Sequence, residues 1–144
     1  MSAGRNSAFA LKCGANGSVT ESDVLWKQTE GLPYVPSAIV YRGQLVMVKD
    51  GGIVTAYDAA SGSETSHGRA AASGKYYASP VAANGHIYFT SLDGDVTVVK
   101  VGSPELVVVA KNPSLEERTA ATPAIADDTL YIRTEKHLYA FADN

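Results

Sequence analysis

The sequence has a single cysteine, Cys13, among 144 residues. One cysteine cannot form a disulfide within the chain, so packing and hydrogen bonds have to hold the fold. Charge is also scarce: charged residues make up 19% of the chain, and the net charge is −3. The lysines and arginines are scattered and form no run. This argues against a nucleic-acid partner, because phosphate binding needs a clustered basic patch.

Long apolar runs are absent too. No stretch approaches the roughly 20 apolar residues needed to span a bilayer, so no transmembrane segment is expected. The first seven residues lack the apolar core of a signal peptide. This start also fits a boundary within a longer chain, so it leaves the compartment open. Helical periodicity is missing except for one possible turn at 114–118.

What the sequence does contain is a segment of about 42 residues that occurs three times. The copies begin at Ser37, Ser79 and Thr122, which are 42 and 43 residues apart. Each copy holds a short apolar run, a polar turn, a β-rich run, a second turn and a third β-rich run. A period of this size made of short strands is typical of β-propeller blades.

The strands of each copy can be placed from these runs and turns. The predicted first strands are 38–41, 81–83 and 124–126, the second 45–48, 87–90 and 130–133, and the third 54–57, 96–99 and 138–141. The first turn of each copy is a pair of residues that tolerates positive φ: Arg42-Gly43, Asn84-Gly85 and Asp127-Asp128.

Outer, fourth strands are predicted near 63–69 and at 105–111. The first of these is weakly β-forming, and the Ser-, Gly- and Ala-rich segment around it, 61–74, is interpreted as a loop that serves as a plain connector. Segments 8–12 and 23–27 look like the third and fourth strands of an earlier blade.

The predicted fold class is therefore all-β, a β-propeller segment of about three and a half four-stranded antiparallel blades. It divides residues 1–144 into strands of a broken blade (7–28), two whole blades (37–69 and 79–111) and a blade without its outer strand (122–143).

No catalytic residue and no metal site are predicted. The aspartates at 93, 95, 127 and 128 lie in predicted hairpin turns, where Asp is favoured for backbone reasons, and they lack the spacing of a calcium loop. The three histidines are too far apart for a local zinc pair. The sequence has no Gly-x-Ser-x-Gly elbow and no phosphate-binding loop.

The connections that lead into the innermost strands carry the candidate ligand contacts. These are amphipathic or cationic side chains expected at the channel mouth, where propellers usually bind ligands: Tyr34, Lys75, Tyr76, Tyr77 and Arg118. Tyrosine suits sugar, peptide or protein contacts. The alternative is that these aromatic side chains pack between adjacent blades.

The Ser-Pro openings and the Asp-Gly turn before the third strand resemble the pyrroloquinoline-quinone-like (PQQ-like) propeller repeat. Ala56, Asp58 and Gly62 follow part of that family's tryptophan-docking motif. The tryptophan of this copy would fall at Ser66. Trp26, in the preceding outer strand, is the residue predicted to dock.

The resemblance covers roughly residues 7–143 and implies two kinds of function. Quinoprotein dehydrogenases of the family bind PQQ with calcium or a lanthanide and use a disulfide between adjacent cysteines, which one cysteine cannot form. Other members are cofactor-free propellers, among them a lipoprotein scaffold of bacterial outer-membrane assembly. The resemblance therefore implies a cofactor-free relative, so no cofactor is expected, and a non-enzymatic role is favoured over an enzymatic one.

The functional hypothesis is a protein-interaction or ligand-binding module that forms a fragment of a larger propeller, which in this family has about seven or eight blades. The alternatives are part of a PQQ-dependent quinoprotein dehydrogenase, or a carbohydrate-binding propeller. The expected partner is another protein or the remaining blades of its own propeller. The isolated chain is expected to self-associate, because its end blades expose apolar faces. The resemblance suggests a periplasmic or secreted location.

Overall fold

The structure is a computed structural model, and it describes residues 7–14, 17–102 and 106–142. Its elements in these ranges are one short 3-10 turn, η1 (Glu21–Asp23), and the strands β1 (Ala8–Leu11), β2 (Val24–Gln28), β3 (Ile39–Tyr41), β4 (Gln44–Lys49), β5 (Ile53–Asp58), β6 (Glu64–Arg69), β7 (Val81–Ala83), β8 (His86–Thr90), β9 (Val96–Lys100), β10 (Val107–Asn112), β11 (Ala124–Ala126), β12 (Thr129–Arg133) and β13 (Leu138–Ala142). No helix in these ranges is long and apolar enough to cross a membrane.

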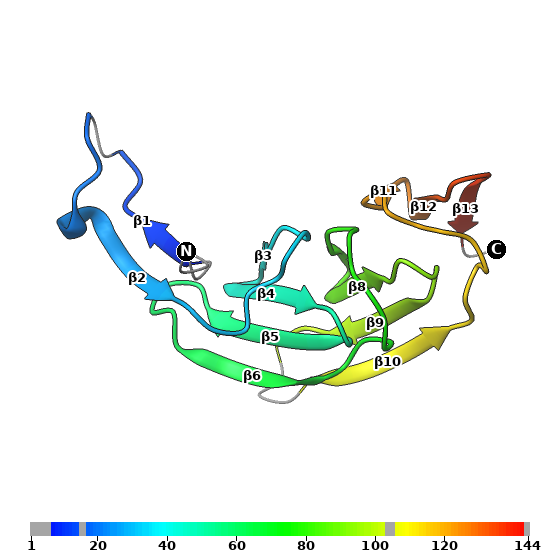
Figure 1. Cartoon of the computed structure of the whole chain (residues 1–144), viewed down its shortest axis with the longest axis horizontal. Coiled ribbons are helices and arrows are strands. Elements are labelled where there is room, and N and C mark those ends of the chain that lie inside the picture. Colours follow the sequence, from blue (N-terminus) through cyan, green and yellow to red (C-terminus); the bar gives the residue numbers. More distant parts are fainter. Residues whose placement is uncertain (1–6, 15–16, 103–105, 143–144) are drawn as a thin grey trace, which may run out of the picture.

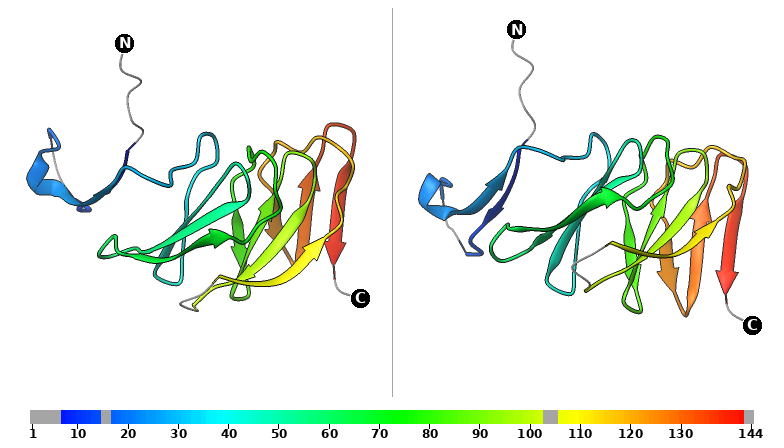
Figure 2. Two further views of the ribbon diagram at one scale, coloured as in Figure 1. Left: turned by 60° about the horizontal axis from the view of Figure 1, so that its bottom comes forward. Right: turned by 90° about the horizontal axis from the view of Figure 1, so that it is seen from below.

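The strands form four antiparallel sheets, each built from strands that are consecutive in the chain. Their orders are β1-β2, β3-β4-β5-β6, β7-β8-β9-β10 and β11-β12-β13. The sheets follow one another along a crescent, with β3, β4 and β8 toward its concave side and β6 and β10 on its convex side (Figure 1). The first strand, β1 (blue), and the last strand, β13 (red), lie toward opposite ends of the row of sheets (Figure 2). This arrangement confirms the predicted all-β propeller segment.

The first hairpin of each blade has the predicted geometry. All six central residues have positive φ: Arg42 (49°), Gly43 (77°), Asn84 (49°), Gly85 (81°), Asp127 (48°) and Asp128 (57°). The residues that flank each two-residue turn are direct partners, as in the pair Tyr41 and Gln44. Two central residues with positive φ define the tight turn whose twist matches paired strands, so the predicted turns are confirmed.

The outer strand predicted near 63–69 is present, so the interpretation of 61–74 as a loop holds only for the residues on either side of it. Residues 64–69 form β6, which pairs with β5 along its length. Ala70 and Ala71 follow it into the core, with exposed fractions of 2% and 3%. β5 presents a complete row of backbone partners, and this pairing overrides the weak strand preference of the sequence. The other predicted outer strand was expected to start at residue 105, which lies outside the described residues; β10 begins at Val107.

The main core lies between the two four-stranded sheets. It combines apolar residues of β4 and β5 with residues of β8, β9 and the connection between the blades: Val46, Val48, Val54, Ala56, Ala70, Ala71, Tyr76, Ile87, Phe89, Val99 and Val101. Neighbouring blades therefore stabilise each other face to face, and consecutive residues of the third strands β5 and β9 are buried.

Two hydrogen bonds also join the blades at their inner ends. The backbone N–H of Ser37 donates to Oγ of Ser79 at 2.9 Å, and the N–H of Ser79 donates to Oγ1 of Thr122 at 3.1 Å. These residues open the three copies of the repeat, and the hydroxyls of Ser79 and Thr122 each accept a backbone N–H from the preceding copy. The Ser and Thr openings of the repeat thus link successive blades.

Candidate functional site

One surface, which we call the loop face, combines two sets of connecting segments. It is built from the connections that lead into the inner strands and from the turns between second and third strands: residues 29–38, 70–80 and 113–123, with 50–52, 91–95 and 134–137. All five candidate ligand contacts of the sequence analysis belong to these connections.

Backbone hydrogen bonds fix the loop face in a repeated way. The N–H of Leu92 donates to the carbonyl of Lys75 at 2.8 Å, and the N–H of Glu135 donates to the carbonyl of Arg118 at 2.9 Å. Lys75 and Arg118 occupy the same position in successive copies of the repeat, 43 residues apart. Each is therefore held by the turn of its own blade in an equivalent position.

Tyr76 is a core residue, which corrects its assignment to the rim. Its side chain is 1% exposed. Its hydroxyl donates to the carbonyl of Ala72 at 2.7 Å, and its backbone N–H donates to Oδ1 of Asp50 at 2.9 Å. Burial raises the pKa of Tyr76. The alternative interpretation, packing between adjacent blades, fits this tyrosine.

Tyr34 is the repeat equivalent of Tyr76, yet it is 86% exposed. The difference has a local cause. Asp50, in the second turn of one blade, holds the backbone of Tyr76 in the next connection. In the described residues, the sheet before Tyr34 consists only of β1 and β2 and has no such second turn. Tyr34 therefore lacks this backbone bond, and it also lacks the packing between two four-stranded sheets that buries Tyr76.

Tyr77 and Arg118 are brought together by the fold. The guanidinium carbon of Arg118 lies 6.0 Å from the centroid of the Tyr77 ring, a cation–π distance. Lys75 is exposed, and the alternation of side chains around buried Tyr76 places it on the same outer side as Tyr77. Two of the five predicted contacts, Tyr77 and Arg118, thus meet at the junction between the second and third blades. Lys75 lies two residues before Tyr77, and Tyr34 lies in the first connection.

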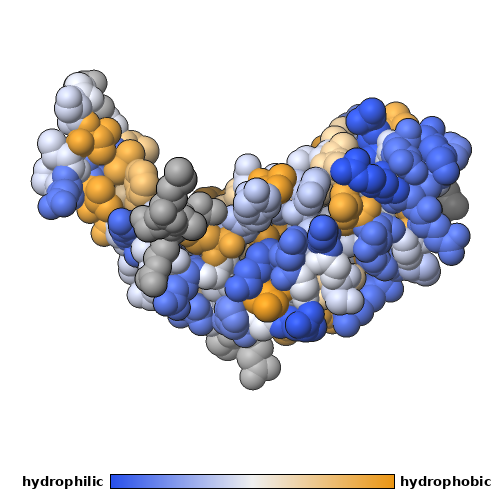
Figure 3. All heavy atoms as spheres, in the orientation of Figure 1, coloured by the Kyte–Doolittle hydropathy of each residue, from blue (hydrophilic) through white to orange (hydrophobic). Residues whose placement is uncertain are grey.

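Two clefts open between neighbouring sheets. One of about 1010 Å³ separates the second whole blade from β11–β13, and its lining includes Tyr88, Leu115 and Phe141. The other, of about 640 Å³, separates β1-β2 from the first whole blade and includes Trp26 and Met47. Apolar atoms gather along the N-terminal arm and in the middle of the concave side (Figure 3).

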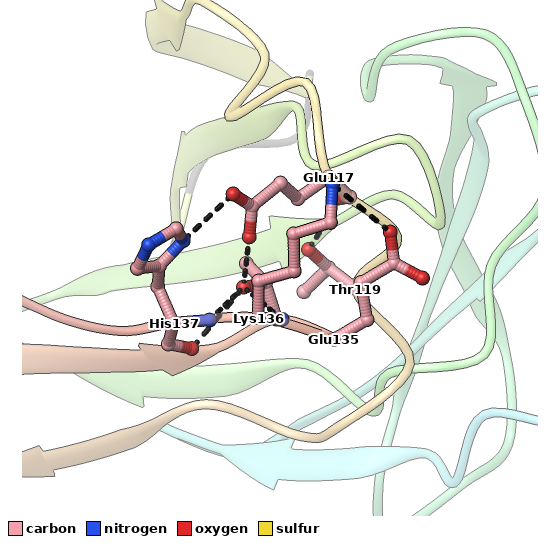
Figure 4. Close-up of polar contacts among 6 residues, drawn as sticks. Glu117, Thr119, Glu135, Lys136 and His137 are labelled. Atoms are coloured by element: carbon pink, nitrogen blue, oxygen red, sulfur yellow. Dashed lines mark hydrogen bonds and ion pairs between the residues drawn. The ribbon is translucent and has the colours of Figure 1, made fainter.

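A polar network at the last blade junction was missed by the sequence analysis (Figure 4). Glu117 Oε1 lies 2.7 Å from Nδ1 of His137, and the hydroxyl of Thr134 donates to the other carboxylate oxygen. The same Thr134 hydroxyl accepts the backbone N–H of His137 at 2.9 Å. One signal was available: Thr134 aligns with Ser91, whose hydroxyl accepts a backbone N–H in the preceding turn.

This network makes the last junction sensitive to acid. Hydrogen bonds from Thr134 and then His137 hold the pKa of Glu117 below its ordinary value. A carboxylate with a lowered folded-state pKa stabilises the fold above the unfolded-state value, about 4.3, and this contribution is lost as pH falls through the folded-state pKa. We expect the free energy of unfolding, measured by urea denaturation, to fall as the pH is lowered below about 4.

The Glu117→Gln variant should show a smaller fall over the same pH range, because its side chain does not titrate. Glu116→Gln is the matched control, because Glu116 is exposed. Its backbone N–H donates to the Ser114 hydroxyl, and its carboxylate has no hydrogen bond within the described residues. Identical pH dependence of the parent protein and Glu117→Gln would contradict the assignment.

Trp26 docks onto the turn between the third and fourth strands of the next blade. Its indole Nε1–H donates to the carbonyl of Ala59 at 3.0 Å. A Cβ on Gly62 would lie 2.5 Å from Cγ of Trp26, so the ring rests directly on this glycine. Gln28 adds a bond from its side-chain amide to the carbonyl of Gly62 at 2.6 Å.

Asp58 shapes the turn that receives the indole. Its Oδ1 accepts the backbone N–H groups of Ala60 at 3.1 Å and Ser61 at 2.8 Å, and also the Ser61 hydroxyl. These bonds, first the one from the Ser61 backbone, lower the pKa of Asp58. Ala56, the other docking residue named from the sequence, is buried in β5. The motif residues thus build the turn, and Trp26 covers it.

The described residues contain no group of three His, Cys, Asp or Glu side chains that could hold a metal ion. Cys13, the chain's single thiol, is exposed.

Comparison with solved structures shows the fold. BamB from Moraxella catarrhalis superimposes with a TM-score of 0.66 at 17% identity, over 82% of this chain and 36% of that protein. The computationally designed Ika4 protein gives 0.67 at 11% identity, over 84% of this chain and 73% of that one. A europium-containing methanol dehydrogenase gives 0.50 at 16% identity, over 65% of this chain and 20% of the enzyme.

The chain thus spans about a third of the length of the M. catarrhalis protein. No protein of curated function matches the sequence. The family described as outer membrane protein assembly factor BamB matches residues 15–143, which is most of the chain. With its PQQ-like repeats and propeller blades, the chain belongs to the family of outer membrane protein assembly factor BamB.

Proposed function

We propose that the chain is part of a non-enzymatic propeller that binds protein partners through its loop face. The observation that carries the proposal is the junction where Tyr77 and Arg118 meet, two residues after exposed Lys75 in the same connection as Tyr77. Tyrosine and arginine are enriched at protein interfaces and at the residues that dominate binding. The bonds to the backbone carbonyls of Lys75 and Arg118 fix the two connections, so less backbone entropy is lost when a partner binds. Membership of a family named for an assembly factor supports the same role.

A random peptide library displayed on phage tests this proposal. Peptides enriched on the purified chain should lose binding to a Tyr77→Ala/Arg118→Ala variant. They should keep binding to Val107→Ala/Lys111→Ala, a control at exposed positions of the outer strand β10. Equal binding to both variants, or no enrichment, would show that the loop face is not a binding surface.

The fold of quinoprotein dehydrogenases motivates a second test. We expect no stoichiometric absorbance change when PQQ and calcium are titrated into the chain, and no binding to a glycan array. A stoichiometric change with PQQ would favour the dehydrogenase alternative, and glycan binding would favour carbohydrate recognition. Either result would overturn the protein-interaction proposal.

We also propose that the isolated chain self-associates. Large apolar side chains are exposed on both end sheets: Phe9 (55%), Leu25 (53%), Leu138 (70%) and Phe141 (45%). β13 is moreover the free edge of its sheet, and such edges and patches pair readily with another chain. Light scattering after size exclusion should give at least a dimer mass, and Leu138→Lys should lower it. A monodisperse monomer would contradict the proposal.

A periplasmic or secreted location is part of the proposal, supported by the outer-membrane name of the family. Fractionation of cells that express the tagged full-length protein would test it. Recovery of the protein only in the cytoplasm would contradict it.

A further inference from the structure

We infer that the cleft between the second whole blade and β11–β13 binds a small phenol, whose ring takes the place that Tyr41 fills in the preceding junction. The inference goes beyond the proposed function, because it concerns a small molecule and a site between blades. It is carried by the comparison of two junctions built from the same repeat. One is filled by a tyrosine of the chain, and the other is open.

Tyr41 shows how the first junction holds a phenol. It ends β3, and its ring packs against the core between the two whole blades. Its hydroxyl accepts the backbone N–H of Gly85, in the first turn of the next blade, at 3.0 Å. The guanidinium carbon of Arg42 lies 5.5 Å from the centroid of the ring, a cation–π distance. One phenol thus connects two blades through packing, a hydrogen bond and a neighbouring cation.

The second junction has the same frame without this ring. Ala83 ends β7 at the repeat position of Tyr41, and Asn84 follows it where the first blade has an arginine. Both residues line the cleft of about 1010 Å³ between these neighbouring sheets of the crescent (Figure 1). Thr119, at the repeat position of buried Tyr76, is also the smaller residue of its pair. This junction therefore lacks two of the rings that occupy the first.

The apolar walls that would receive the ring are present. In the first junction, Ala82 and Ile87 of the second whole blade belong to the same apolar cluster as Tyr41. Their counterparts in the next copy of the repeat, Ile125 and Leu130, line the cleft. The opposite sheet contributes Tyr88 of β8 to the lining. A flat ring held between these side chains would gain the free energy of burying apolar and aromatic surface.

Asp128 supplies a polar group for the hydroxyl of the phenol. It is the second residue of its turn, as Gly85 is in the preceding blade, and their φ values of 57° and 81° are both positive. Its backbone N–H corresponds to the donor that Gly85 offers to Tyr41, and it has no backbone partner among the described residues. Asp127 and Asp128 both line the cleft. A neutral hydroxyl, which can accept an N–H and donate to a carboxylate, suits this end better than an anion.

A titration of the isotope-labelled chain with p-cresol, followed by heteronuclear NMR, tests the inference. p-Cresol is the side chain of tyrosine as a free molecule. Amide signals of the residues that line the cleft should shift in a saturable way at millimolar concentration, as expected for so small a ligand. The amide proton of Asp128 should move downfield, because it gains a hydrogen bond. Toluene, which lacks the hydroxyl, and p-toluate, which is an anion, should bind about threefold or more weakly.

Two variants copy the first junction into the second. Ala83→Tyr places a ring of the chain in the cleft and should abolish the binding of p-cresol. Asn84→Arg supplies the cation and should strengthen binding by about two- to fivefold. Arg42 and Asn84 share a φ of 49°, so the backbone accepts an arginine here. This gain of affinity cannot arise from damage to the fold.

The matched control is Val109→Tyr, which adds a tyrosine at a position of β10 that is 47% exposed and does not line the cleft. It should leave the affinity for p-cresol unchanged. All variants should keep the emission spectrum of Trp26, the single tryptophan, as evidence of folding.

Three results would overturn the inference: toluene that binds as tightly as p-cresol, unchanged binding to Ala83→Tyr, or shifts confined to residues outside the cleft. If Ala83→Tyr does not fold, Asn84→Arg decides, and an affinity no higher than that of the parent chain would contradict the site. The phage experiment on Tyr77 and Arg118 tests the proposed function separately, so the failure of one proposal leaves the other standing.

Discussion

The Gly52→Ala variant is expected to lose about 4 kcal/mol of unfolding free energy or to fail to fold, as substitutions that disrupt buried packing can. A Cβ on Gly52 would lie 2.3 Å from the carbonyl oxygens of both Ala71 and Ala72. Both are backbone atoms of the connection that closes the core between the two whole blades. No side-chain rotation relieves the clash, so the connection would have to move.

Gly43→Ala is the matched control for this variant. Gly52 and Gly43 have φ values of 72° and 77°, so the added methyl group strains both backbones similarly. Nothing lies within 4 Å of a Cβ on Gly43, and we expect the strain alone to cost about 1 kcal/mol there. Urea denaturation followed by circular dichroism measures both. Equal losses of unfolding free energy in the two variants would mean that the close approach of the connection to Gly52 does not affect stability.

The Trp26→Ala variant is expected to lose about 3 kcal/mol, near the lower end of the range for tryptophan truncation because the side chain is only half-buried. The indole lies on Gly62 and donates to the carbonyl of Ala59. Its loss should detach β1 and β2 from the first whole blade. Hydrogen exchange of their backbone amides should therefore rise, whereas exchange in β8 and β9 should change little.

Trp26→Phe separates ring packing from the hydrogen bond. It keeps an aromatic ring on the turn but cannot donate a hydrogen bond, so the unfolding free energy should fall by about 1 kcal/mol for the lost bond. It should fall further because phenylalanine covers less of the turn than tryptophan. A Phe variant as unstable as the Ala variant would mean that the hydrogen bond, and not the ring contact, holds the docked position.

Gly62→Ala tests the same contact from the other side. The added Cβ would lie 2.5 Å from Cγ of Trp26, so in the parent protein the ring must leave the turn and its emission should shift to the red. In the Trp26→Ala background the clash is gone, and only the strain of a positive φ, about 1 kcal/mol, should remain. Additive costs of the two substitutions would contradict direct docking.

Local sequence signals determined the repeat and its hairpins. Asn84-Gly85 and its two counterparts carry the positive φ values of a two-residue turn, and a two-residue turn fixes the register of the strands on either side. The all-β class and most strand positions follow from these signals, because turn chemistry and strand alternation act over a few residues.

Other features depended on partners that are distant in the sequence. β6 has a weakly β-forming sequence; its position was predicted from the repeat, and the backbone partners on β5 hold it as a strand. Likewise, the sequence could not show which of Tyr34 and Tyr76 is buried. The two share one repeat position, but only Tyr76 lies between two four-stranded sheets and packs in the core that they form, so one is exposed and the other is buried.

The same division applies to the candidate site. The sequence by itself predicted Lys75, Tyr77 and Arg118 as candidate contacts, together with Tyr34 and Tyr76, because all five lie in the connections that lead into the repeat. Only the tertiary structure paired Tyr77 with Arg118 across a blade junction and joined Glu117 to His137. A repeat determines what each blade is made of, whereas contacts between blades depend on side chains that differ from copy to copy and meet only when the blades pack.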